Sequence, residues 1–269
     1  VIFMRDAEGR RVRHMGYDAE GIALWRDPGS GRRRLLVCSE GGVEYGIPPA
    51  LYEHDLDGVM QREFEIPALL RELGNPGRGP RHNLAFEGVA PTPDGTHAWV
   101  AMEGSLLQDE STSQKHLQNG PRRITRFNLV TGRADRQVAY VPQPRPRAPV
   151  LPDLFQVNGI SDLLVASDDR LWALERAYFP LLGFRVRLYE VELGSATDTL
   201  HLDALTADNH VPARKRLLVD LNRLDLPVVD NFEAMSWGPV LANGHRTVVL
   251  ATDDNFMRMQ TTQFVAFEV

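Results

Sequence analysis

The sequence predicts an all-β protein built as a β-propeller, and two observations support this prediction. A pattern of an acidic residue, a short apolar run, a turn, a second apolar run and another acidic residue occurs four times in the 269-residue chain. The chain also has 22 glycines and 18 prolines. The combined fraction of these two residue types is somewhat above the usual value of about 12%. This composition favours a fold rich in turns over one built from long helices.

Each repeat begins with an acid at a regular distance from the last. The leading acids are Glu20, Glu87, Asp162 and Glu233, which lie 67, 75 and 71 positions apart. The acids that close the second apolar run are Glu40, Glu103, Glu175 and Asp253. Turn residues such as Asp-Gly at 94–95 and Asn-Gly at 243–244 separate the two runs, and this arrangement is typical of a β-hairpin.

Two more strand-like runs follow each of the first three hairpins. They cover residues 50–56 and 60–66, residues 124–129 and 136–141, and residues 186–193 and 215–221. Four strands per repeat are typical of propeller blades, and radial closure leaves fewer exposed strand edges than an open meander would. The fourth repeat has only three predicted strands, the last at residues 263–269. We therefore predict four blades here, and five or six in the complete domain.

We predict a single propeller domain over residues 1–269, with N-terminal sequence missing because the chain opens with Val1 and an upstream blade is expected. Residues 1–4 would form either the outer strand of a preceding blade or the strand that completes the last one. Proline near the start and glycine at the end predict a short helix at residues 66–74. The proline-rich residues 142–154 are expected to be an extended connection.

Composition and motifs exclude several classes of protein. The net charge is −6 and no basic run dominates, so we expect no nucleic-acid partner. Cys38 is the only cysteine, which excludes an internal disulfide and a cysteine zinc cluster. No apolar run approaches the roughly 20 residues that cross a bilayer. The motifs of zinc proteases, serine hydrolases and phosphate-binding loops are also missing from the sequence.

The repeated acids are the candidate functional residues. Inner strands of a propeller run beside its axis, so acids at equivalent positions would meet at one end of the channel. Clustered carboxylates repel one another unless they are protonated or neutralised, and Ca²⁺ is a hard cation that prefers oxygen ligands. The predicted calcium ligands are Glu20, Glu40, Glu87, Glu103, Asp162, Glu175, Glu233 and Asp253.

A structural interpretation of the same acids stays open. An acid at the start of a strand can accept backbone N–H bonds, and an acid at its end can pair with an arginine, as Glu175 and Arg176 would. The acids would then hold neighbouring blades together or simply face solvent. Repetition indicates a shared role but does not separate these alternatives.

Several ordered segments resemble the phytase-like propeller family, which is described by esterase-like activity of phytase. They are residues 83–95, 159–164, 171–176, 230–235, 253–256 and 260–267. The resemblance extends from about Tyr17 to Val269. It departs from the family pattern at Ala234, where glycine usually follows the glutamate.

The resemblance implies a Ca²⁺-dependent hydrolase that acts on phosphoric or other esters of a small anionic substrate at the channel mouth. It implies catalytic roles for Glu87, Glu103, Glu175 and Arg176, with Arg176 or Arg126 holding phosphate oxygens. It also implies a bacterial protein exported to the periplasm or secreted. The alternative is a non-catalytic propeller that binds a ligand or protein partner, with structural acids. The oligomeric state stays unknown.

Two further arginines, just before the predicted strand that contains Arg126, are candidates for contact with an anionic substrate. They are Arg122 and Arg123. The alternative is that arginines at such positions face solvent.

Overall fold

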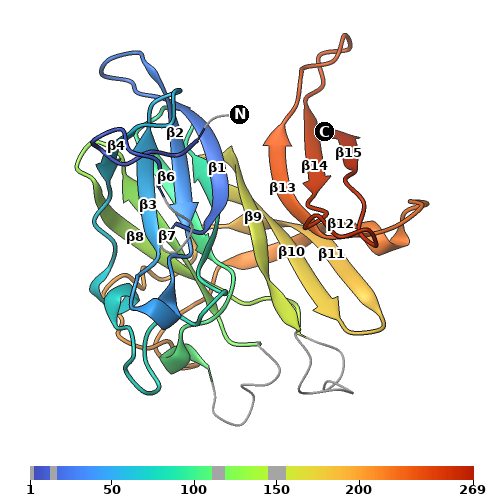
Figure 1. Ribbon diagram of the computed structural model, residues 1–269. Coiled ribbons are helices and arrows are strands. Elements are labelled where there is room, and N and C mark those ends of the chain that lie inside the picture. Colours follow the sequence, from blue (N-terminus) through green and yellow to red (C-terminus); the bar gives the residue numbers. More distant parts are fainter. Residues whose placement is uncertain (1–2, 13–16, 111–118, 145–155) are drawn as a thin grey trace.

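The computed structural model describes residues 3–12, 17–110, 119–144 and 156–269, which form four antiparallel sheets arranged as the blades of a β-propeller (Figure 1). The first blade contains β1 (Ala19–Arg26), β2 (Arg33–Ser39), β3 (Ala50–His54) and β4 (Met60–Glu63). The second contains β5 (Phe86–Pro91), β6 (His97–Met102), β7 (Arg122–Asn128) and β8 (Arg133–Tyr140). Strand order in each sheet follows the chain.

The last two blades follow the same meander. The third blade contains β9 (Val157–Ser167), β10 (Arg170–Phe179), β11 (Gly183–Glu192) and β12 (Arg214–Asp220). The fourth contains β13 (Phe232–Trp237), β14 (Thr247–Thr252) and β15 (Phe264–Glu268). The all-β propeller prediction is confirmed, and the fourth repeat has the three strands expected from sequence.

The inner strands contact one another in chain order, β1 with β5, β5 with β9, and β9 with β13. Three apolar clusters fill the space between successive blades, because each sheet between two others buries both of its faces. Phe86 and Phe127 belong to the first cluster, Ile160 and Tyr140 to the second, and Phe232 to the third. Packing between blades therefore fixes the positions of the inner strands and of the acids at their ends.

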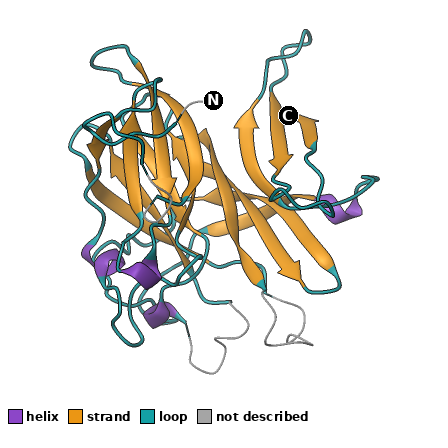
Figure 2. Cartoon of the chain, in the orientation of Figure 1, coloured by secondary structure: helices purple, strands orange, loops and turns teal. Residues whose placement is uncertain are grey.

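Among the described residues, helical structure is limited to short 3₁₀ turns at the edges of the sheets (Figure 2). They are η2 (Val43–Tyr45), η3 (Ala68–Arg71), η4 (Leu107–Asp109) and η6 (Leu221–Arg223). The predicted helix at residues 66–74 is present only as the single turn η3. Most of the proline-rich segment 142–154 lies outside the described residues.

Residues 1–2 of the predicted N-terminal strand lie outside the described residues, and residues 3–12 have a different place from the one predicted for residues 1–4. Arg5 N donates to Gly58 O at 2.8 Å, and Met60 N donates to Arg5 O at 3.0 Å. Val12 N donates to Met4 O at 3.0 Å and closes a small hairpin. Residues 3–12 thus extend the outer edge of the first blade, because β4 offers unpaired backbone groups there, and they add no strand to the fourth blade.

Candidate functional site

Each inner strand carries a β-bulge near its start. In the first blade Ala19 pairs with Ser39 and Gly21 with Cys38, so Glu20 has no partner opposite it. The same irregularity falls at Glu233 in the fourth blade. Where two residues of one strand lie opposite a single residue of the partner strand, the bulged strand bends and the extra side chain is redirected. The bulge is thus the local feature that brings these glutamates to the axis.

The second blade carries the bulge at Glu87 and Gly88, between the Phe86 and Val89 pairs. Gly88 permits the close approach of the next inner strand. A Cβ atom on Gly88 would lie 2.7 Å from Leu163 N and 2.8 Å from the Cα of Asp162. Glycine after the acid therefore has a packing role between blades, since backbone meets backbone at that point.

The third blade carries its bulge one residue earlier than the repeat predicts. Ile160 pairs with Glu175 and Asp162 pairs with Leu174, so the unpaired residue is Ser161. Ser161 is therefore the counterpart of Glu87, and Arg176 is the counterpart of Glu103. The predicted equivalence of Asp162 and Glu175 with the acids of other blades is wrong by one position, and a shift of one residue turns a strand side chain to the opposite face.

Asp162 and Glu175 consequently lie in other environments. Asp162 accepts the Met235 N–H at 2.6 Å and the Leu163 N–H at 2.8 Å, so it joins the third blade to the fourth. Glu175 pairs with Lys215 and accepts the Tyr140 hydroxyl hydrogen at 2.6 Å. Glu175 does not belong to the acid group at the channel, because its side chain lies on the face of β10 opposite that of Arg176.

Six carboxylates converge where the inner strands begin, and we call them the channel cluster. Its members are Asp18, Glu20, Glu40, Glu87, Glu103 and Glu233. One oxygen from each of Glu40, Glu87 and Glu103 lies within 4.8 Å of the others, and all three residues are buried. Asp18, Glu20 and Glu40 satisfy the same distance limit. Glu40 therefore belongs to both groups and joins them.

Asp253 lies at the border of the channel cluster. Its backbone N–H donates to Asn231 O at 3.0 Å, which places it opposite the start of β13. Its exposed carboxylate accepts the Asn255 N–H at 2.9 Å in a local turn. Its charge helps to raise the pKa of Glu233. Asp253 therefore lies near the channel cluster, but one of its carboxylate oxygens is already hydrogen-bonded within its own loop.

Burial and mutual repulsion make the channel cluster costly to ionise. Burial is the largest cause that raises the pKa of Glu40 to about 9, and the charges of Glu103 and Glu20 add to it. Burial is the largest cause that raises the pKa of Glu20 to about 8, and the charges of Asp18 and Glu233 add to it, although Glu20 is partly accessible to solvent. Burial raises the pKa of Glu87 well above its ordinary value. These are the shifts expected for carboxylates that share a site without a cation.

Arg176 is the basic residue within this group. Its Nη2 donates to Glu103 Oε1 at 2.7 Å, and its Nη1 pairs with Glu233. Glu40 Oε1 accepts the Ala85 N–H at 2.6 Å. The Glu87 carboxylate has no hydrogen bond or ion pair with a described residue, although the backbone O of Glu87 accepts the Cys38 thiol hydrogen at 3.3 Å. One guanidinium offsets only part of six carboxylates, so the donor chemistry fits a divalent cation with oxygen ligands.

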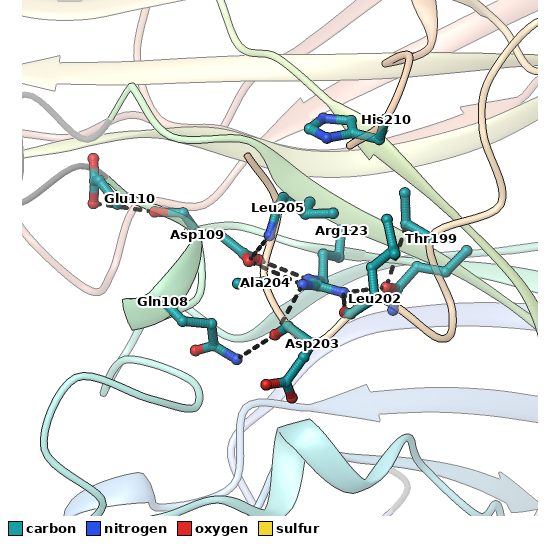
Figure 3. Close-up of polar contacts among 12 residues, drawn as sticks. Gln108, Asp109, Glu110, Arg123, Thr199, Leu202, Asp203, Ala204, Leu205 and His210 are labelled. Atoms are coloured by element: carbon teal, nitrogen blue, oxygen red, sulfur yellow. Dashed lines mark hydrogen bonds and ion pairs between the residues drawn. The ribbon is translucent and has the colours of Figure 1, made fainter. Parts of the chain in front are cut away.

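Two buried arginines of β7 support the scaffold, and one of them, Arg122, donates from Nε to the backbone O of Glu103 at 2.9 Å. Arg122 and Arg123 are buried, which differs from the expectation of either solvation or substrate contact. Arg126 pairs with Asp135 at 2.8 Å at a partly exposed position. Arg123 binds both oxygens of Asp109 at 2.6 and 2.9 Å, and Figure 3 shows it among the backbone carbonyls of the loop at residues 202–205. A cavity of about 540 Å³ borders this network, and none of its lining residues belongs to the channel cluster.

The raised pKa values lead to a prediction about pH. Glu20 and Glu40 have folded-state pKa values of about 8 and 9, above the ordinary 4.5. The folded state therefore holds protons more tightly than the unfolded state, and its stability should fall as pH rises from about 5 to 9 in the presence of a chelator. Thermal unfolding at pH 6 and pH 9 measures this change. Glu40→Gln keeps an acceptor for Ala85 and should reduce the pH dependence, whereas an unchanged slope would contradict the assignment.

Residues 1–256 match the phytase-like family, which is described as "Esterase-like activity of phytase". The chain belongs to this family of propellers. No curated protein sequence matches the chain. In the described part of the chain, no helix combines the length and the apolar character needed to cross a membrane.

Two solved structures resemble the chain at low sequence identity. Hydrazine synthase of Kuenenia stuttgartiensis is 14% identical with a TM-score of 0.42, over 97% of this chain and 52% of that one. The Dos1 propeller is 6% identical with a TM-score of 0.36, over 87% of this chain and 52% of that one. The chain spans about half the length of each of these two structures.

Proposed function

We propose that the channel cluster holds a Ca²⁺ ion and that the protein hydrolyses phosphoric or other esters at this end of the propeller. The observation that carries this proposal is the group of Glu40, Glu87 and Glu103, which are buried with ligand oxygens within 4.8 Å of one another. An all-carboxylate donor set suits Ca²⁺, because Ca²⁺ accepts six to eight oxygens in flexible geometry. Membership of a family described by esterase-like activity supports the reaction class.

Glu40, Glu87 and Glu103 would hold the cation, with Asp18 and Glu20 completing the oxygen shell. A bound cation of this kind lowers the pKa of a ligand water and offsets negative charge on the substrate. Glu87 is the candidate for moving a proton, since no described residue binds its carboxylate. Glu103 is held in place by Arg176 at 2.7 Å. Glu175 lies in its own network with Lys215 and would support the scaffold.

Calcium binding is tested by thermal unfolding of the wild-type chain with Ca²⁺ and with a chelator. Stability should rise with Ca²⁺ concentration, by about 2.7 kcal/mol at a hundredfold excess over the dissociation constant. Glu87→Gln should weaken this binding about tenfold or more, the equivalent of about 1.4 kcal/mol. Glu192→Gln is the matched control, because Glu192 is an exposed acid on β11. Equal thermal stability of the wild type with Ca²⁺ and with the chelator would reject the site.

Hydrolysis is tested with p-nitrophenyl phosphate and p-nitrophenyl acetate under the same conditions. Turnover should require Ca²⁺. Glu87→Gln should lose turnover, whereas Glu192→Gln should keep it.

We further propose that the protein acts in the periplasm or outside the cell.

The second candidate is a non-catalytic propeller whose acids join the blades. Two contacts favour it, namely Glu40 with the Ala85 N–H at 2.6 Å and Asp162 with the Met235 N–H at 2.6 Å. Each links one blade to the next. Calcium binding by the wild type without turnover of either ester would favour this alternative.

A further inference from the structure

Large apolar side chains are exposed at the tips of two loops, one in the third blade and one in the fourth. The most exposed large apolar side chains of the described residues are Leu181 (89%), Phe256 (103%) and Met259 (96%). Leu182 and Met257, which lie beside them in the chain, are exposed as well. We call these five residues the apolar rim.

Both loops lie at the end of the propeller where the inner strands begin. The loop of the third blade is the turn between β10 and β11, and Tyr178 just before this turn pairs with Val157 at the start of β9. In the fourth blade, Asp253 N donates to Asn231 O at 3.0 Å, so the loop after β14 lies beside the start of β13. The apolar rim is therefore at the same end of the propeller as the channel cluster.

The loop of the fourth blade pairs its polar side chains internally and presents its apolar side chains to solvent. Asp254 accepts the Phe256 N–H at 2.9 Å and the Thr262 hydroxyl hydrogen at 2.8 Å. Asn255 Nδ2 donates to Gln260 Oε1 at 3.1 Å. Phe256 has a φ of 55°, in the left-handed region that bulky residues rarely adopt. Hydrogen bonds thus hold the loop in a conformation that exposes the phenyl ring.

The turn of the third blade is built in a similar way. Leu181 has a φ of 69°, which is also in the left-handed region. Leu182 N donates to Phe179 O at 3.0 Å and closes the turn. The rings of Tyr178 and Phe184 lie behind it with centroids 5.0 Å apart. Two ordered loops therefore direct leucine, phenylalanine and methionine side chains into water, which is unfavourable unless another surface covers them.

An exposed arginine accompanies the apolar side chains in each loop. Arg258 lies between Met257 and Met259 in the chain, and Arg185 follows the turn of the third blade. Neither arginine forms an ion pair with a described residue, and the side chain of Arg185 contacts only the backbone O of Phe184. Positive charge beside apolar side chains complements a surface that is both anionic and apolar below its charged layer.

We propose that the apolar rim inserts into the surface of a lipid bilayer that contains anionic phospholipids. Arg258 and Arg185 would lie at the level of the lipid phosphates, since an arginine keeps its charged group in the polar layer while its stem lies among apolar groups. The cavities of about 360 and 540 Å³ contain no residue of the rim. Its side chains project from loop tips instead, which suits a deformable lipid surface.

The test is co-sedimentation of the wild-type chain with vesicles of phosphatidylcholine, with and without phosphatidylglycerol. A chelator is present throughout, because Ca²⁺ could bridge the carboxylates of the protein and the lipid phosphates. The chain should bind the vesicles that contain phosphatidylglycerol, and binding should weaken without this lipid and at high salt. No binding to the phosphatidylglycerol vesicles would overturn the proposal. Because Ca²⁺ is absent, failure of the calcium site leaves this result unchanged.

A double variant locates the contact. Phe256→Asn with Met259→Gln replaces two apolar side chains by polar ones, and asparagine tolerates the left-handed conformation at residue 256. Vesicle binding should weaken about tenfold or more, because two side chains lose their burial in the bilayer. The melting temperature should stay unchanged, since both side chains are exposed in the free protein.

Val130→Ser is the matched control for the double variant. Val130 is exposed in the turn between β7 and β8, at the opposite end of the propeller. Its replacement should leave vesicle binding unchanged. Unchanged binding by the double variant, or an equal loss in Val130→Ser, would overturn the proposal.

Two further measurements test the charge and the kind of partner. Arg258→Gln should lower binding to the phosphatidylglycerol vesicles and leave binding to phosphatidylcholine unchanged, and equal binding to both by this variant and the wild type would contradict the role of Arg258. Analytical ultracentrifugation without vesicles tests a contact between two copies of the chain. A dimer that dissociates in the Phe256→Asn, Met259→Gln variant would assign the apolar rim to that contact and overturn the membrane proposal.

Discussion

Asp109→Ala should lower the free energy of unfolding by about 3–5 kcal/mol, because it leaves the buried charge of Arg123 without its partner. The side chains of both residues are 0% exposed, and their oxygens and nitrogens lie 2.6 and 2.9 Å apart. Asp109 Oδ1 also accepts the Leu205 N–H at 2.8 Å. The substitution therefore removes an acceptor from two buried donors at once.

Asp109→Ala should also weaken contacts between the second blade and the third. Arg123 Nη1 donates to Leu202 O at 2.9 Å, so this arginine also holds the loop between β11 and β12 of the third blade (Figure 3). Equilibrium unfolding in denaturant gives the change. Asp203→Ala is the control, since Asp203 pairs with Arg78 through a side chain that is 75% exposed. It should cost less than about 1 kcal/mol, and a similar small cost for Asp109→Ala would contradict the prediction.

Gly88→Ala should cost about 1–3 kcal/mol or more, as expected for overpacking in a closely packed region. The new Cβ atom would lie 2.7 Å from Leu163 N and 2.8 Å from the Cα of Asp162. Both are backbone atoms and cannot move aside as a flexible side chain would. The inner strands β5 and β9 would have to separate, and the loss of contact between the second and third blades would lower stability.

Thermal or denaturant unfolding measures the Gly88→Ala effect. Gly29→Ala is the matched control, because the atom nearest to its added Cβ is Asp27 Oδ1 at 3.4 Å, an ordinary contact. Gly29 lies in the exposed turn between β1 and β2. Equal stability losses in the two variants would show that the close approach at Gly88 has no special role.

Much of the candidate site could be predicted because its acids recur with the blade. Glu20, Glu40, Glu87, Glu103 and Glu233 were all predicted to meet, and the structure brings these five together. Asp18 was missed, since it precedes the repeat pattern and looks like an ordinary loop acid.

The third blade shows where matching acids by sequence failed. The apolar residues Phe86, Ile160 and Phe232 are all fully buried and mark the same position in three blades. Aligning on them, rather than on the acids, would have identified Ser161 as the counterpart of Glu87. The pattern of acids alone could not identify Ser161, because Asp162, one residue later, matches the acid expected at that point of the repeat.

The sequence by itself determined the blade, its four-strand repeat and the convergence of acids, since these follow from apolar periodicity and turn residues. Only the tertiary structure decided which acids share the channel. A bulge shifted by one residue sends Asp162 and Glu175 into contacts between blades and places Arg176 among the carboxylates. The physical reason is that a strand side chain changes face with every residue, so the register of the hydrogen-bond ladder determines which groups meet.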